Sequence, residues 1–169
     1  PFEGATVRVE PSGRVFVATG ACSQGQGHET TLAQLCAERL GVRVEDVVVL
    51  TGDTAAIPLG AGTYASRSGV TAGNAVSRAA LLVREKALRV AAQLLEAAPA
   101  DLELVEGRIF VRGAPERGLP LGEVARVLSA PPPAYLFPPD LEPGLEATTY
   151  YHPEGNVYSY GTHAAIVEV

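Results

Sequence analysis

The chain has 169 residues, of which 47% are hydrophobic and 19% are charged, and its formal net charge at pH 7 is -6. The length fits a single domain, and the hydrophobic content supplies a buried core, which excludes an intrinsically disordered chain. The acidic balance argues against a nucleic-acid-binding surface, whose signature is a basic patch, and the apolar runs are too short to cross a membrane.

The two cysteines, Cys22 and Cys36, have a spacing that fits no metal site. We interpret both as small apolar residues in a reduced, cytoplasmic protein. The sequence contains no methionine, begins at Pro1 and ends within an apolar run. We therefore expect residues 1–169 to form one fragment of a larger polypeptide, with 100–140 as a candidate sublobe.

The first predicted elements are a hairpin and a helix. Apolar and polar residues alternate over residues 6–10 and 14–19, and the Pro-Ser-Gly sequence at 11–13 between them is typical of a turn. Residues 30–40 then repeat apolar side chains at helical spacing. Gly41 follows directly, and glycine is the residue that most often ends a helix. The pattern predicts two antiparallel strands followed by one helix.

The middle of the chain predicts a strand, a long loop and a long helix. The apolar run at 47–50 is typical of a short buried strand, and residues 51–68 form a long irregular loop. An apolar stripe at helical spacing extends over residues 70–97, a helix about 40 Å long. A second hairpin is predicted at 102–111.

The last part of the chain predicts a short helix at 121–128, an extended connection marked by the prolines of 131–133 and 138–139, and strands at 145–151 and 158–169. This order of elements is typical of a mixed α+β fold rather than of a regular alternation of strands and helices. We therefore predict mixed sheets with two amphipathic helices, one of them long, each entered from a loop rich in glycine or serine.

Two loops of small residues, at 23–30 (SQGQGHET) and 60–69 (GAGTYASRSG), each connect a predicted strand to a predicted helix. A helix N-terminus carries about half a positive charge and several unpaired N–H groups, and glycines let a ligand approach the backbone closely. Two such loops in one domain predict an extended anionic ligand that forms many hydrogen bonds, rather than a lone sulfate.

The first loop lacks the signatures of nucleotide-binding loops. Its third glycine position falls on Thr30, so it does not match the dinucleotide-binding fingerprint, and it has no P-loop lysine. Gln24 and Gln26 supply amide donors and acceptors, which can hydrogen-bond to a heterocycle edge or to a phosphate. The alternative is an ordinary tight turn that begins a helix.

The second loop combines hydroxyl groups with an arginine. Thr63, Ser66 and Ser68 carry hydroxyls, and Arg67 beside a helix N-terminus suits a phosphate. In the alternative interpretation, Ser68 or Thr71 caps the long helix and Arg67 is a surface charge. We expect one of these caps to form, which would not prevent a ligand from binding nearby.

The remaining chemically active residues indicate no catalytic or metal site. His28, His152 and His163 are too widely separated for a metal triad, so we interpret each as a surface or core residue. Glu29 falls in the first turn of a predicted helix, where its charge complements the helix dipole, and Asp53 is typical of a turn. No nucleophile elbow occurs. We therefore assign no catalytic and no metal-ligating residue.

Three segments, in this order, resemble the large, molybdenum-cofactor-binding subunit of the xanthine dehydrogenase and aldehyde oxidase family. They are residues 23–30 (SQGQGHET), 62–68 (GTYASRS) and 141–147 (LEPGLEA), the last followed by Tyr150 and Tyr151. The similarity extends over nearly the whole chain and is greatest to the large subunits of the carbon-monoxide-dehydrogenase type. It corresponds to about a fifth of such a subunit.

The resemblance implies a molybdopterin cofactor with molybdenum, in bacteria often the cytosine dinucleotide form, bound between domains of the large subunit. It implies that the first loop contacts the pterin or a phosphate and that the second loop lines the cofactor, with Ala65 nearest the metal. The cofactor-binding residues implied in this way are Gln24, Gly25, Gln26, Gly27, Ala65, Ser66, Arg67 and Ser68.

Enzymes of this family oxidise a small-molecule substrate (an aldehyde, a purine-like heterocycle or carbon monoxide) with water as the oxygen source. A glutamate acts as the base, and electrons pass to iron–sulfur and FAD subunits or domains. Neither the motif of that glutamate nor the cysteine loop of the carbon monoxide enzymes occurs in this sequence. The resemblance therefore implies a molybdopterin-binding part that has no catalytic base of its own and holds no cofactor in isolation. The alternative function is a non-catalytic module that binds a phosphorylated ligand or assembles subunits.

Overall fold

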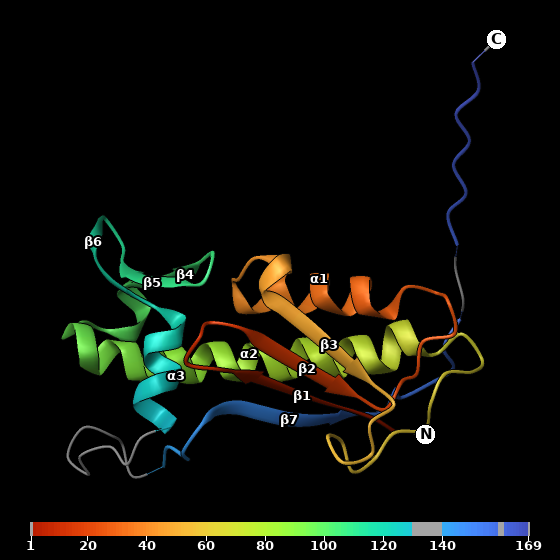
Figure 1. Cartoon of the computed structure of the whole chain (residues 1–169), viewed down its shortest axis with the longest axis horizontal. Helices are drawn as coiled ribbons and strands as arrows, with labels where there is room; N and C mark the ends of the chain where they lie inside the picture. The colour runs from red at the N-terminus through yellow and green to blue at the C-terminus, as the bar shows by residue number, and fades with distance from the viewer. Residues whose placement is uncertain (1, 130–139, 159–160, 169) are drawn as a thin grey trace.

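A four-stranded sheet forms one layer of the fold (Figure 1). The computed structural model describes residues 2–129, 140–158 and 161–168. The strands of the sheet are β1 (Glu3–Val9), β2 (Val15–Thr19), β3 (Val47–Thr51) and β7 (Leu145–Tyr151). In the order β3-β2-β1-β7, β1 pairs antiparallel with both β2 and β7, whereas β2 and β3 pair in parallel.

Two helices pack on this sheet. α1 (His28–Leu40) connects β2 to β3, and α2 (Ser68–Leu95) follows the loop after β3. α2 packs against β1, β7 and α1, and α1 also packs against β3. Val7 and Val17 of the sheet and Val76 of α2 are fully buried in the shared core, and each such side chain stabilises the fold by about 1.5–3 kcal/mol. No helix in the described part of the chain is long and apolar enough to cross a membrane.

A smaller antiparallel sheet packs against α2, at the end of the molecule opposite to the N-termini of α1 and α2 (Figure 1). It contains β4 (Leu102–Val105), β5 (Arg108–Val111) and β6 (Ala114–Pro120), and it is followed by α3 (Leu121–Ser129). Short 3-10 helices, η1 (Val44–Asp46) and η2 (Pro99–Asp101), precede β3 and β4. Because α3 contacts α2, β1 and β7, the smaller sheet and α3 share the core of the larger sheet.

The structure confirms the α+β class and most of the predicted elements. Both hairpins, the three helices and the strand at 145–151 form where the patterns predict them. α1 begins at His28 and α2 at Ser68, each slightly before its predicted start. The sequence does not predict β6, because this segment contains proline and glycine and lacks a clear alternation. Its strand forms through pairing with β5.

Two strand predictions differ from the structure. The run at 47–50 forms β3, but at the edge of the sheet, where it is half-buried and Leu50 is 41% exposed. Of the predicted strand at 158–169, the described residues form no strand, and Ile166 is fully exposed. A strand needs a hydrogen-bonding partner, and none of the described strands pairs with this segment. The predicted proline-rich connection lies outside the described residues.

Gly41 ends α1 where the helix meets the smaller sheet. Its φ is +91°, and a Cβ built there would lie 2.5 Å from both the Leu104 carbonyl oxygen and Arg84 Nη1. We predict that Gly41→Ala destabilises the chain by about 2–5 kcal/mol, through left-handed strain and overpacking together. Gly113→Ala is the matched control, because Gly113 also has a positive φ but has open space around it. It should cost only about 1–2 kcal/mol in urea unfolding, and equal losses for the two variants would contradict the packing argument.

Candidate functional site

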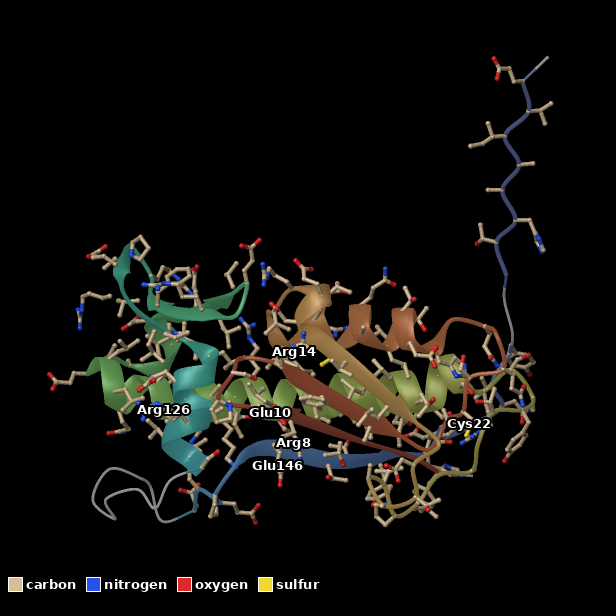
Figure 2. All side chains as sticks on the ribbon, in the orientation of Figure 1. Arg8, Glu10, Arg14, Cys22, Arg126 and Glu146 are labelled. Atoms are coloured by element: carbon tan, nitrogen blue, oxygen red, sulfur yellow. The ribbon has the colours of Figure 1, made fainter. Side chains whose placement is uncertain are left out.

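The two predicted loops meet at one end of the molecule. Residues 20–27 connect β2 to α1, and residues 52–67 connect β3 to α2. Because β2 and β3 are parallel neighbours, their carboxyl ends lie at the same edge of the sheet, and both helices begin there (Figure 1). The Thr63 hydroxyl donates a 2.6 Å hydrogen bond to the Cys22 carbonyl oxygen, which joins the loops directly. Figure 2 shows Cys22 at this end. In open α/β sheets, ligands commonly bind outside the carboxyl ends of parallel strands.

Two glycines shape the first loop. Gly25 has φ +100°, and Gly27, the N-cap residue of α1, has φ +74°, with open space around both. The Gln24 N–H donates a hydrogen bond to Gln26 Oε1, so the loop is held partly by its own side chain. None of the described side chains caps α1. The N–H groups of its first turn therefore remain suited to bind an anion at the helix start.

The second loop contains a strained turn. Ala65 and Ser66 both have φ +52°, in the left-handed region, although neither is a glycine. Each such residue costs about 1–3 kcal/mol and persists only where the surrounding structure fixes it. Both residues are exposed. The residues on either side are joined, because Ser68 Oγ donates a 3.3 Å hydrogen bond to Thr63 Oγ1. Successive N–H groups in a turn of this kind can together face an anion.

Arg67 is buried, so the interpretation as a surface charge is wrong. It is 4% exposed, and its Nη1 lies 2.8 Å from Glu3 Oε2 in an ion pair. The expected cap on α2 does not form either. Arg67 is the N-cap residue, Ser68 already lies within the helix, and none of the described side chains caps it. The Thr71 hydroxyl donates to the Arg67 carbonyl oxygen, a bond to the preceding turn that competes with capping.

A groove of about 1230 Å³ lies between α1 and α2 at this end, and Tyr158, Gly161 and Thr162 near the C-terminus also line it. Gln26 of the first loop, and Ser66 and Ser68 of the second loop, all line it. The structure therefore brings the two predicted loops to one cavity. The other residues implied by the resemblance flank these three in sequence without lining the groove: Gln24, Gly25, Gly27, Ala65 and Arg67.

His28 belongs to the groove, which the sequence pattern alone does not indicate. It begins α1, is 8% exposed and lines the cavity. Its Nδ1 is buried and has no hydrogen-bond partner among the described residues. The available signal was its position directly after Gly27, at a helix start. His152 instead packs its ring against Phe2, with centroids 5.0 Å apart, and the described residues hold no cluster of three metal-binding side chains.

The groove contains little charge. Of its lining residues, Glu38 of α1 is the one with a formal charge at neutral pH. Anionic groups of a ligand would therefore meet N–H, hydroxyl and amide groups rather than cationic side chains. Lys86 lies in a separate hollow beside β7, where burial lowers the pKa of its amine while Glu142 and Glu146 act in the opposite direction.

The two cysteines differ in their surroundings. Cys36 is fully buried, as predicted, and burial raises the pKa of its thiol to about 12. Cys22 is exposed, so the prediction of an apolar filler is wrong for it, because the chain has left the sheet at this point. Asp53 is confirmed as a turn residue, since its Oδ1 accepts a 2.8 Å hydrogen bond from the Ala55 N–H.

The molybdopterin cofactor-binding domain family matches the chain over residues 1–169. The chain is 42% identical over 168 residues to the carbon monoxide dehydrogenase large chain of Afipia carboxidovorans, a match that covers 99% of this chain and 20% of that protein. It is 39% identical over 165 residues to the nicotine 6-hydroxylase large subunit of Paenarthrobacter nicotinovorans, over 98% of this chain and 20% of that protein. The crystal structure of quinoline 2-oxidoreductase from Pseudomonas putida 86 matches with a TM-score of 0.77 and 43% identity, over 90% of this chain and 19% of that one.

These similarities confirm the predicted resemblance and the molybdopterin cofactor that it implies. The chain spans only 20% of the length of the relatives named above. The roles of the single residues at the two loops stay predictions.

We predict that one of the two thiols reacts in the folded chain. The Cys36 thiol stays protonated well above neutral pH, and the thiolate is the reactive form, whereas Cys22 is exposed. Titration with an aromatic disulfide reagent at mildly alkaline pH should label one thiol in the folded chain and both after denaturation. Cys22→Ser should abolish the native reaction, and Cys36→Ser should leave it unchanged. Rapid native labelling of Cys36 would contradict its burial.

Proposed function

Since the chain belongs to the molybdopterin cofactor-binding domain family, we propose that the groove between α1 and α2 binds the molybdopterin cofactor. The observation that carries this proposal is the meeting of the two loops. Gln26, Ser66 and Ser68 come from segments about forty residues apart, and all three line the same cavity. The cavity runs from the two loops along α1 as far as Glu38, with a volume of about 1230 Å³, which fits a pterin joined to a nucleotide through phosphates.

The groups present in the groove fit such a cofactor. The volume of about 1230 Å³ slightly exceeds the range of about 300–1000 Å³ that is usual for small-molecule sites. The two helix starts and the turn at Ala65 and Ser66 offer N–H donors for phosphate oxygens. The imidazole of His28 and the amide of Gln26 add groups that can pair with the edge of a heterocycle.

The residues of this chain would bind and orient the cofactor rather than react. When bound, the molybdenum centre supplies the oxidation chemistry. Gln26, Ser66 and Ser68 would fix the position of the cofactor along the groove, and the helix starts would hold its anionic groups. The carboxylate of the groove, Glu38, is exposed and lies toward the C-terminal end of α1. We therefore assign the catalytic base to the rest of the subunit.

We propose that the whole protein is the large subunit of a cytoplasmic molybdenum hydroxylase. Its substrate would be an aldehyde, a purine-like heterocycle or carbon monoxide, oxidised with oxygen from water, and its partners would be iron–sulfur and FAD subunits. One relative, at 42% identity, is named as a subunit of the 6-hydroxypseudooxynicotine dehydrogenase complex of Paenarthrobacter nicotinovorans, which supports a multi-subunit assembly.

Gln26→Ala and Ser66→Ala test the proposed site. Each removes one hydrogen-bonding group from the groove, and a bond to a charged group is worth about 1.5–3 kcal/mol, so we expect the cofactor to bind about tenfold or more weakly. Pterin and molybdenum content per purified full-length protein gives the measurement. Gln93→Ala, in the exposed last turns of α2, and Ser12→Ala, in the β1–β2 turn, are matched controls that should retain full content. Unchanged content in both groove variants would refute the proposal.

A separate prediction concerns the isolated chain. Because the chain spans only 20% of the length of the relatives named above, we expect the rest of the subunit to complete the cavity, so residues 1–169 alone should bind the cofactor weakly. Isothermal calorimetry with purified molybdopterin measures this directly. Tight binding at one equivalent would show that the groove is sufficient by itself and would contradict a cavity shared with the rest of the subunit.

A further inference from the structure

We propose that Glu3 and Arg67 are positioning residues, whose buried ion pair holds the strained turn at Ala65 and Ser66 in the shape that faces the groove. This inference rests on the proposed cofactor site and assigns a role to two residues that do not line it. It explains why a buried pair of charges lies directly behind an exposed turn.

The ion pair is almost completely removed from water. Arg67 Nη1 lies 2.8 Å from Glu3 Oε2, and the side chains are 5% and 0% exposed. Charged side chains are almost never buried in this way unless they are paired, and loss of one partner leaves the other charge without compensation. Substitution of either Glu3 or Arg67 should therefore disturb the segments that the pair connects.

The arginine closes the second loop on itself. Arg67 Nη1 also donates a 2.7 Å hydrogen bond to the Gly62 carbonyl oxygen, so the side chain of residue 67 turns back across the segment that precedes it. The Tyr64 ring lies against the guanidinium, with 5.2 Å from Cζ to the ring centroid. The turn at Ala65 and Ser66 therefore lies between two points that one guanidinium connects.

The glutamate connects this closed loop to the sheet. Glu3 is the first residue of β1, pairs with Gly60 in an isolated bridge, and accepts a 3.3 Å hydrogen bond from the Ala61 N–H. A Cβ at Gly20 or at Gly60 would lie 2.9 or 2.8 Å from Glu3 Oε1, so both glycines leave room for the carboxylate. The Phe2 carbonyl oxygen accepts a further 3.1 Å bond from Arg67 Nη2.

The position of the turn relative to the groove follows from these contacts. Left-handed alanine and serine persist only where the surroundings fix them, and Arg67 is the residue that directly follows the two. Ser66 lines the groove and directly precedes Arg67. Without the contacts of Arg67 to Glu3 and Gly62, the turn would relax to ordinary backbone angles, and the Ser66 N–H and hydroxyl would move away from the ligand.

The test separates positioning from plain stability, and it uses the full-length protein that carries this chain. Glu3→Gln breaks the pair. The double variant Glu3→Leu with Arg67→Met replaces it by apolar side chains of similar size, which often preserves overall stability. Glu103→Gln is the matched control, because it breaks the exposed 2.8 Å pair with Arg112 in the smaller sheet. Melting temperature, amide hydrogen exchange of residues 61–68 in cofactor-free protein, and cofactor content are measured for each.

We expect Glu3→Gln to lower the melting temperature, to speed exchange of residues 61–68 at least tenfold, and to lower cofactor content. The double variant should regain much of the melting temperature, less the cost of the lost bonds to Gly62 and Phe2, but neither the exchange protection nor the cofactor. The control should match the unmodified protein in all three. Recovery of protection and cofactor together with melting temperature in the double variant would show that the pair acts through stability alone, and would overturn the inference. Unchanged exchange in Glu3→Gln would also overturn it.

The two proposals fail in different ways. If Gln26→Ala loses cofactor while Glu3→Gln keeps it, the positioning role is wrong and the cofactor site stands. If Gln26→Ala, Ser66→Ala and Glu3→Gln all keep the cofactor, the site itself is wrong, and the positioning role fails with it.

Discussion

The parallel pairing of β2 with β3 is the constraint on which the site depends. Its register runs from Val15 opposite Val47 to Thr19 opposite Thr51, so both strands end level, and the Gly52 N–H continues the pairing with a 3.2 Å bond to the Thr19 carbonyl oxygen. Parallel neighbours need a crossover connection, and α1 supplies it. Since α1 returns along the sheet, the loop that begins it lies beside the loop that leaves β3. An antiparallel hairpin at this point would have placed the two loops at opposite ends.

The start of α2 combines close helix packing with an open groove. Gly73 approaches α1 so closely that a Cβ would lie 3.2 Å from Leu35 Cδ1. Ala72 lines the groove and, like Ala75, is fully buried. Small side chains let the helix backbones approach, and the same missing volume leaves space toward the loops. Larger residues at these positions would either fill the groove or push α1 away from α2. The first change would remove space for a ligand, and the second would move Gln26 away from Ser66.

A structural feature can be predicted from the sequence when the residues that determine it are close together along the chain. The first hairpin and the helix stop at Gly41 follow from neighbouring residues, so local patterns are sufficient for them. Glu3 and Arg67 pair across 64 residues of sequence, and no spacing rule connects them. A single arginine in a polar loop resembles a solvated one, although this one is buried. The apolar run of β3 likewise gives no sign that its strand lies at the edge, because exposure there depends on the order of strands in the finished sheet.

The candidate site also depends on a core that lies far from it. The left-handed conformations of Ala65 and Ser66 together cost about 2–6 kcal/mol. The free energy of unfolding of a domain is about 5–15 kcal/mol, so this strain is a large share of it. A buried ion pair offsets little of this, because removing two charges from water cancels most of their attraction. Val76, Val83 and Val90 are buried along α2, and each stabilises the fold by about 1.5–3 kcal/mol. Since the strained turn directly precedes this helix, the burial of the later turns supplies stability that offsets the strain, while the proposed Glu3–Arg67 contact sets where the turn lies. A core substitution at the far end of α2 would therefore lower the stability that offsets the strain of the turn, although none of the described residues that line the groove lies there.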